Sequence, residues 1–143
     1  MIGMSAPLYN KDILRLAAGI PHHRRLAEAQ ATVEKRSATC GSRVTADAMM
    51  LDGRLAAMGL DVKACALGQA SAALMAGHAV GLTANELADA RDRLAAYLAG
   101  ESDDLDFWPG LAVLAPARGY PARHAPIRLA FEAMAEAARM ADA

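Results

Sequence analysis

The sequence predicts an α+β domain in which a small antiparallel sheet of about three strands packs against several helices. Alternating apolar and polar residues on both sides of an Asp-Gly pair predict a β-hairpin. Apolar residues at helical spacing follow the hairpin and continue towards the C-terminus. The chain of 143 residues contains no internal repeat, so we expect residues 1–143 to form a single domain.

The first expected element is a helix that ends before Gly19 and Pro21. Ser5 and Pro7 suit an N-cap and an early helical position. Four apolar residues can then line one side of this helix: Leu8, Ile13, Leu14 and Ala17.

Residues 21–25, PHHRR, are interpreted as a solvated loop, because adjacent histidines do not project to one point. Residues 31–35 then mix Thr and Val with charged residues. This composition predicts an edge strand.

The β-hairpin is expected over residues 43–63. Its outgoing strand alternates apolar and polar residues from position 43, which predicts one buried face. Asp52-Gly53 is a dipeptide favoured where a tight turn needs positive φ at both central residues. In the return strand, Leu60 and Val62 alternate with polar residues.

Helices follow from Ala66 onward, where ALGQASAALMAGHAVG has no proline to interrupt it. Thr83 and Glu86 form a capping-box pattern at the start of a second helix. The stretch LDFWPGLAVLAPARGYPAR predicts packed irregular structure or short helical turns. A last helix is expected from about Pro126, because proline fits the first helical turn.

The composition argues against nucleic-acid-binding, membrane-bound and secreted proteins. Fifteen basic and sixteen acidic side chains leave a net charge of -1, which indicates neither a nucleic-acid partner nor a charged membrane surface. No apolar run approaches the roughly 18 residues of a membrane span, and the start lacks a secretory pattern. We therefore expect a cytoplasmic protein whose cysteines remain thiols.

Cys40 and Cys65 are the two cysteines of the chain. Cys40 precedes the outgoing strand and Cys65 follows the returning strand, so closing the hairpin brings both thiols to one end. Cys65 also lies at a helix start, where the helix dipole favours the thiolate. The alternative is that both are small buried hydrophobic residues, as free cysteines commonly are.

Three segments, TCGSRV, ACALGQAS and YPARHAPIRLAFEAM, together resemble the iron-sulfur cluster assembly scaffolds of the IscU, SufU and NifU N-terminal family. The resemblance extends over nearly the whole chain. It implies the family's α+β fold, a role as scaffold or as sulfur or metal carrier, and a cysteine desulfurase and apo iron-sulfur proteins as partners. The cargo it implies is an iron-sulfur cluster or iron, alternatively zinc.

Family members use three cysteines, and often an Asp, to hold this cargo. Cys40 and Cys65 match the first two positions, whereas Ser42 stands where the Asp is expected and Pro126 where the third Cys is expected. Two ligands rarely hold a metal firmly. His124, close before Pro126, is a candidate third ligand; the alternative is a surface or capping histidine.

Two hypotheses of function remain open. The first is a scaffold or carrier that uses Cys40, Cys65 and His124, with a sulfurtransferase of the SufU kind as a variant. The second is an adaptor or regulator of the same fold that binds no metal and contacts a desulfurase or another assembly factor. Both thiols favour the first, and Ser42 and Pro126 favour the second.

Overall fold

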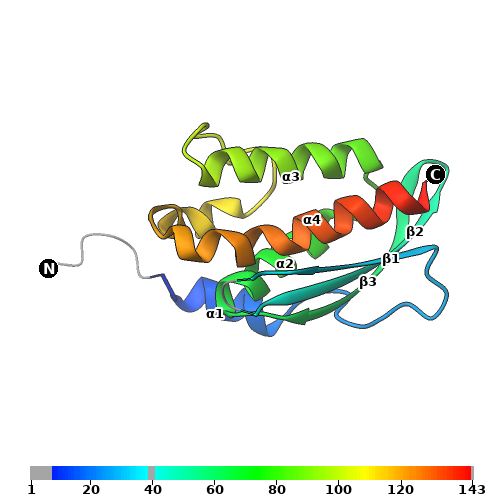
Figure 1. Cartoon of the computed structure of the whole chain (residues 1–143), viewed down its shortest axis with the longest axis horizontal. Helices are drawn as coiled ribbons and strands as arrows, with labels where there is room; N and C mark the ends of the chain where they lie inside the picture. The colour runs from blue at the N-terminus through cyan, green and yellow to red at the C-terminus, as the bar shows by residue number, and fades with distance from the viewer. Residues whose placement is uncertain (1–7, 39–40, 143) are drawn as a thin grey trace, which may run out of the picture.

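A computed structural model describes residues 8–38 and 41–142. Helices pack on one face of a three-stranded antiparallel sheet, in the order β1-β2-β3, which confirms the predicted α+β class (Figure 1). The strands are β1 (Ala31–Arg36), β2 (Arg43–Leu51) and β3 (Arg54–Lys63). The α-helices are α1 (Lys11–Ala18), α2 (Ala66–His78), α3 (Ala84–Leu98) and α4 (His124–Ala141). No helix among the described residues has the length and apolar character needed to cross a membrane.

The predicted hairpin is confirmed at both of its ends. Asp52 and Gly53 have φ values of 54° and 76°, the positive values that a tight turn of this kind requires. At the open end Arg43 pairs with Lys63. A bulge lies between Met49 and Met50. The predicted edge strand is confirmed as β1, which pairs with β2.

Both faces of β2 are buried, whereas the alternation predicted a single buried face. Val44, Ala46 and Ala48 face the helices as expected, but Asp47, on the opposite face, is also 0% exposed. The Asp47 carboxylate accepts hydrogen bonds from the Arg25 guanidinium, the Leu26 backbone N–H and the Thr32 hydroxyl. Burial alone would raise the pKa of Asp47, but these hydrogen bonds outweigh it and hold the pKa below its ordinary value.

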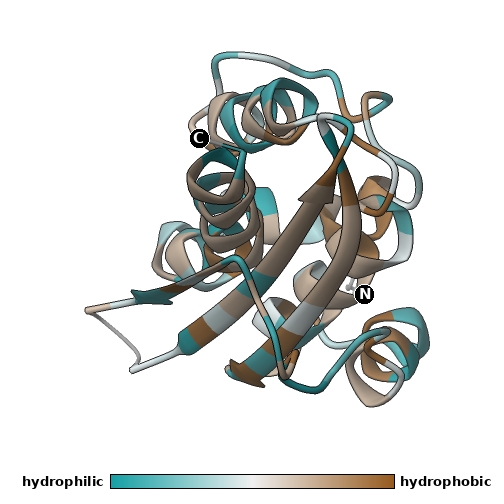
Figure 2. Cartoon of the chain, turned by 90° about the vertical axis from the view of Figure 1, so that its right-hand side faces the viewer, coloured by the Kyte–Doolittle hydropathy of each residue, from teal (hydrophilic) through white to brown (hydrophobic). Residues whose placement is uncertain are grey.

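Two of the three partners of Asp47, Arg25 and Leu26, belong to residues 20–26, the crossing segment, which passes over the face of the sheet opposite the helices (Figure 2). Its backbone is bonded to β3, because the Leu60 N–H donates to the carbonyls of His22 and Arg24, each at 3.0 Å. The Val62 N–H donates to Nε2 of His23 at 3.2 Å. The prediction of a solvated loop is therefore wrong for the backbone, although the two histidine and two arginine side chains are exposed.

The helix α1 begins later than expected. Asn10 is its N-cap and accepts a hydrogen bond from the Ile13 N–H at 3.0 Å, while Ser5 and Pro7 lie outside the described residues. Asn is about as good an N-cap as Ser, and Asn10, which directly precedes Lys11, is the residue that caps this helix. Within the expected apolar stripe Ile13 is buried, but Leu14 is 54% exposed.

The remaining helices form where the sequence predicts them. The capping box of α3 is present, with Thr83 and Glu86 bonded reciprocally. Between α3 and α4 the chain forms the short 3-10 helices η1 (Leu111–Gly119) and η2 (Pro121–Arg123). The single Trp of the chain, Trp108, is buried there and donates to the Leu74 carbonyl at 2.8 Å. This segment is therefore packed against the core, as expected.

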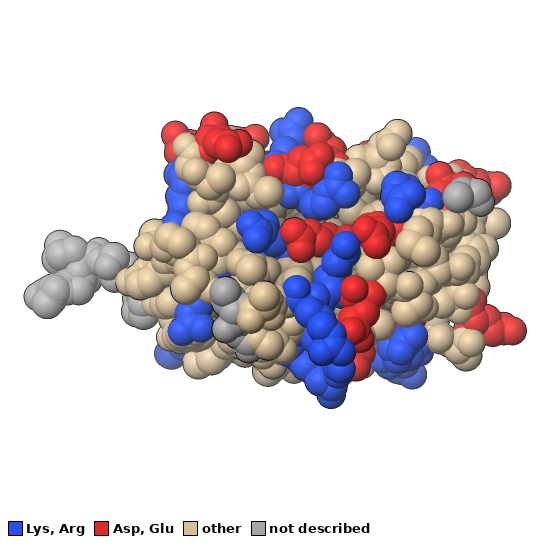
Figure 3. Space-filling view, viewed as in Figure 1, with Lys and Arg blue, Asp and Glu red and all other residues tan. Residues whose placement is uncertain are grey.

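Charges of both signs intermingle on the face shown in Figure 3. Ion pairs between described residues include Lys35 with Glu136 and Arg128 with Glu132. The view shows no broad field of one sign, in keeping with the net charge of -1.

Candidate functional site

Cys65 is the N-cap of α2. Its thiol is free and half-buried, and its side chain makes no capping hydrogen bond. The first turn of α2 contains no acidic residue that would compensate the helix dipole. The first backbone N–H groups of a helix have no partner within the helix, and the Cys65 side chain leaves them uncapped.

The connection between β1 and β2 lies at the same end of the sheet as Cys65. The Ser37 N–H donates to the Ser42 carbonyl at 2.8 Å, and the Gly41 N–H donates to the Ser37 carbonyl at 3.1 Å. Arg43, at the start of β2, pairs with Lys63, which closely precedes Cys65. Cys40 lies outside the described residues, so the expected approach of the two thiols remains a prediction.

His124 is the first residue of α4 and is half-buried. Its Nε2 lies 2.8 Å from the Arg118 carbonyl oxygen, which is an acceptor, so Nε2 carries the proton. In the neutral ring Nδ1 keeps its lone pair and is the atom through which His124 can bind a metal in this position. The hydrogen bond also gives the histidine a structural role, because it joins η1 to α4.

The starts of α2 and α4 lie against one another. A Cβ atom added to Gly68 would lie 2.8 Å from the Ala64 Cβ and 3.2 Å from the Pro126 carbonyl oxygen, so the two helices meet where Gly68 has no side chain. The Ser71 hydroxyl donates to the Ile127 carbonyl at 2.6 Å. Cys65 and His124 therefore come from neighbouring helix starts, with Pro126 beside the first turn of α2.

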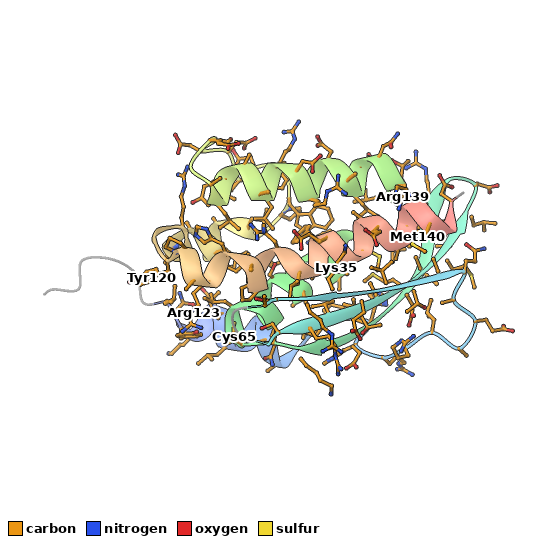
Figure 4. The ribbon with its side chains drawn as sticks, in the orientation of Figure 1. Lys35, Cys65, Tyr120, Arg123, Arg139 and Met140 are labelled. Atoms are coloured by element: carbon orange, nitrogen blue, oxygen red, sulfur yellow. The ribbon has the colours of Figure 1, made fainter. Side chains whose placement is uncertain are left out.

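Basic and aromatic side chains share this end of the molecule. Cys65, Tyr120 and Arg123 lie at one end, and Arg139 and Met140 lie at the other (Figure 4). Tyr120 is 53% exposed, and the Arg123 guanidinium lies 6.0 Å from the centre of the Tyr9 ring. Among the described residues no acidic side chain forms an ion pair with Arg123.

Across residues 8–38 and 41–142, no group of three His, Cys, Asp or Glu side chains is arranged to hold a metal ion. One thiol and one imidazole at neighbouring helix starts are soft donors suited to zinc or iron, but two donors make an incomplete shell. The predicted set of Cys40, Cys65 and His124 therefore depends on Cys40.

Sequence reasoning missed three features of this end. These are the hydrogen bond that occupies His124, the close contact at Gly68, and the exposed Tyr120 with the half-buried Arg123. The run of small residues in ACALGQAS is a signal for the close contact at Gly68, because small residues permit close helix contacts. The hydrogen bond of His124 depends on Arg118, whose carbonyl is positioned by the 3-10 helix η1. No local sequence pattern indicates this bond.

The solved structures include similar chains. Over 94% of each chain, this chain is 38% identical to the N-terminal part of a nitrogen-fixing NifU-like protein from Brucella abortus, with a TM-score of 0.87. A protein from Fervidobacterium islandicum, named as an iron-sulfur cluster assembly scaffold for the SUF system, is 20% identical, with a TM-score of 0.84. That match covers 92% of this chain and 96% of the other, and it shows a shared fold. Neither a protein-family model nor a curated protein matches the sequence.

Proposed function

Since this chain belongs to the family of NifU-like N-terminal domains, we propose that it is a scaffold or carrier in iron-sulfur cluster assembly. Its cargo is iron, a labile iron-sulfur cluster or sulfur, alternatively zinc, held through Cys40 and Cys65 with His124 as a third ligand. A cysteine desulfurase and apo iron-sulfur proteins are its proposed partners. The chemistry needs reduced thiols, which places the proposed function in a reducing compartment such as the cytoplasm.

The observation that carries this proposal is the position of Cys65. A half-buried free thiol occupies the N-cap of α2, where no side chain caps the helix and no acidic residue lies in the first turn. A cysteine that only packs against the hydrophobic core, as Cys65 also does in part, does not benefit from a helix start. A cysteine that works as a thiolate does, because the helix N-terminus stabilises the charged form.

The proposed sulfur transfer uses this thiolate as a nucleophile. The Cys65 sulfur attacks the outer sulfur of a persulfide on the donor cysteine, and a new S–S bond forms on Cys65. The S–S bond of the donor breaks, and the donor cysteine leaves as a thiolate. The product is a persulfide on Cys65, and no external oxidant or reductant is consumed.

Metal and acid-labile sulfide analysis of anaerobically purified protein tests the proposal. Reconstitution with ferrous iron, cysteine, a cysteine desulfurase and dithiothreitol as reductant should give bound iron or bound sulfide, and the same mixture without dithiothreitol should give an added sulfur atom on the Cys65 peptide by mass spectrometry. Cys65→Ser and Cys40→Ser should each abolish the metal or sulfide signal. A wild-type protein that acquires none of the three would overturn the proposal.

A second function, that of an adaptor or regulator without metal, is favoured by His124 and Pro126. The imidazole is already hydrogen-bonded to the Arg118 carbonyl, and a buried proline, Pro126, occupies the expected third thiolate position. Under this alternative the protein binds a desulfurase or another assembly factor equally well as wild type and as Cys65→Ser. A pull-down that compares these two forms in a metal chelator distinguishes the two functions.

A further inference from the structure

A groove on the side of the molecule formed by the crossing segment and β3 is separate from the thiol end. It has a volume of about 610 Å³ and lies between the crossing segment, residues 56–58 of β3, and Val80. This volume is within the roughly 300–1,000 Å³ typical of small-molecule sites. Its apolar lining includes Ile20, Leu26, Ala57 and Val80. The lining therefore suits a ligand with an apolar body.

The polar groups that line the groove are donors or cations. Arg25 is committed to Asp47, but Arg24 lines the groove and no described carboxylate forms an ion pair with it. Nε2 of His23 accepts the Val62 N–H, so in the neutral ring Nδ1 carries the proton and is a donor. None of the described residues that line the groove is acidic.

The edge of β3 adds a backbone donor. The Ala48 carbonyl accepts the Gln30 N–H on the side of β1, so Ala48 and its partner Met58 form a non-hydrogen-bonded pair. The Met58 N–H therefore points away from β2. It lies on the same side of β3 as the Leu60 N–H, which donates to the carbonyls of the crossing segment. The outer edge of β3 is covered at two places on either side of Met58. These are Leu60 and Leu55, whose N–H donates to the Leu82 carbonyl. The Met58 N–H faces the groove.

From these observations we propose that the groove binds a small organic carboxylate with an apolar chain, of the size of a medium-chain fatty acid. The carboxylate is held by Arg24, with the Nδ1–H of His23 and the Met58 N–H as further donors. The chain lies against Ile20, Leu26, Ala57 and Val80. A charge-assisted bond to an arginine provides the specificity for the anion, and the apolar wall provides the preference for a chain.

An NMR titration of the full chain with octanoate, kept below its micelle concentration, tests this. We expect a single site with Kd of about 1 mM or lower and shift changes confined to residues 20–26, 56–58 and 80. Octanol, which lacks the charge, and acetate, which lacks the chain, should each bind about tenfold more weakly. Equal binding of octanol, or shift changes elsewhere, would overturn the proposal.

Two variants test the groove without threatening the fold, because both side chains are exposed. Arg24→Gln and Val80→Glu should each weaken octanoate binding by about tenfold. Their matched controls, Arg139→Gln and Leu51→Glu, change exposed residues outside the groove and should leave binding unchanged. If Arg24→Gln binds as wild type, the proposal is wrong. Concentration-dependent dimerisation through the same residues would assign the groove to a second copy of the chain and would also overturn it.

Discussion

The Ser71 hydroxyl in α2 donates a buried hydrogen bond of 2.6 Å to the carbonyl oxygen of Ile127 in α4. Because Gly68 allows the helix starts to meet, this bond fixes the position of α4 relative to the turn that carries Cys65. The proposed site therefore depends on helix packing as well as on its ligands.

Ser71→Ala should lower the free energy of unfolding by about 1 kcal/mol, since it removes one intramolecular hydrogen bond without creating a large cavity. Urea unfolding monitored by Trp108 fluorescence measures this. Ser102→Ala, which removes an exposed hydrogen bond from the Asp104 N–H in the connection after α3, provides the control and should change stability less. A Ser71→Ala protein as stable as wild type would show that the bond does not hold the two helices together.

Asp47→Asn should destabilise the protein at pH 7 by about 2 kcal/mol or more, because the carboxylate is fully buried and accepts bonds from three residues. The pKa of Asp47 is lowered in the folded state. Its ionised form therefore contributes stability above the ordinary pKa of an Asp, near 4, and that contribution is lost as pH falls through the lower folded pKa.

Unfolding measured over a series of pH values checks the prediction for Asp47. The difference in unfolding free energy between wild type and Asp47→Asn should narrow as pH falls below about 4. Asp61→Asn, which removes a surface partner of Arg43, is the control and should change stability by less than about 1 kcal/mol. A constant difference across this range would rule out Asp47 as the titrating group.

Gly59→Ala and Gly77→Ala should have opposite effects on the free energy of unfolding. A Cβ at Gly59 would lie 2.5 Å from the Arg24 carbonyl oxygen and 2.7 Å from the Leu26 nitrogen, so the crossing segment would have to move. We expect a loss of about 1–3 kcal/mol. No neighbouring atom lies within 4 Å of a Cβ at Gly77, which is within α2, so alanine there should stabilise the protein by about 0.5–1 kcal/mol. Thermal unfolding measures both, and a harmless Gly59→Ala would contradict the close packing.

Pro126→Cys should raise zinc affinity by about tenfold or more, because Pro126 lies beside the first turn of α2 and a thiolate there would add a ligand. The loss of a favourable first-turn proline should lower metal-free stability slightly. Competition with a chromophoric chelator measures affinity, and unfolding with and without zinc separates the two effects. The gain should disappear in the Pro126→Cys, Cys65→Ser double variant; if it persists, zinc is bound elsewhere.

His124→Ala should also weaken zinc or ferrous binding, provided that Nδ1 is a ligand. Because the ring also bonds the Arg118 carbonyl, a loss of stability is expected as well. His124→Gln is the informative companion, since its amide can donate to the same carbonyl while offering a poor zinc ligand. If both variants bind metal as wild type does, His124 is structural.

Features determined by neighbours in the chain could be predicted from the sequence. Asp52-Gly53 specifies its turn through its own backbone preferences, and Thr83 with Glu86 closes a capping box within one helical turn. The burial of Asp47 could not be predicted in this way. It depends on Arg25, which is distant in sequence, and the alternation in β2 indicates one buried face whatever covers the other.

The same limit applies to the site. The position of Cys65 at a helix start follows from its place between a strand and an alanine-rich helix. The bond between His124 and Arg118 depends on how η1 ends, which involves the Arg118 guanidinium above the Tyr97 ring, 4.4 Å from its centre. Tertiary contacts of this kind leave no periodic signal in the sequence.

The crossing segment also affects how the protein behaves at high concentration. An exposed edge strand offers unpaired N–H and C=O groups to other chains and is a common start of aggregation. Here the outer edge of β3 is covered at Leu60 and Val62 by the crossing segment and at Leu55 by Leu82. The stretch left open around Met58 is too short to template a second strand. Detaching the crossing segment, as Asp47→Asn would promote, should therefore uncover this edge and make the protein more prone to aggregate.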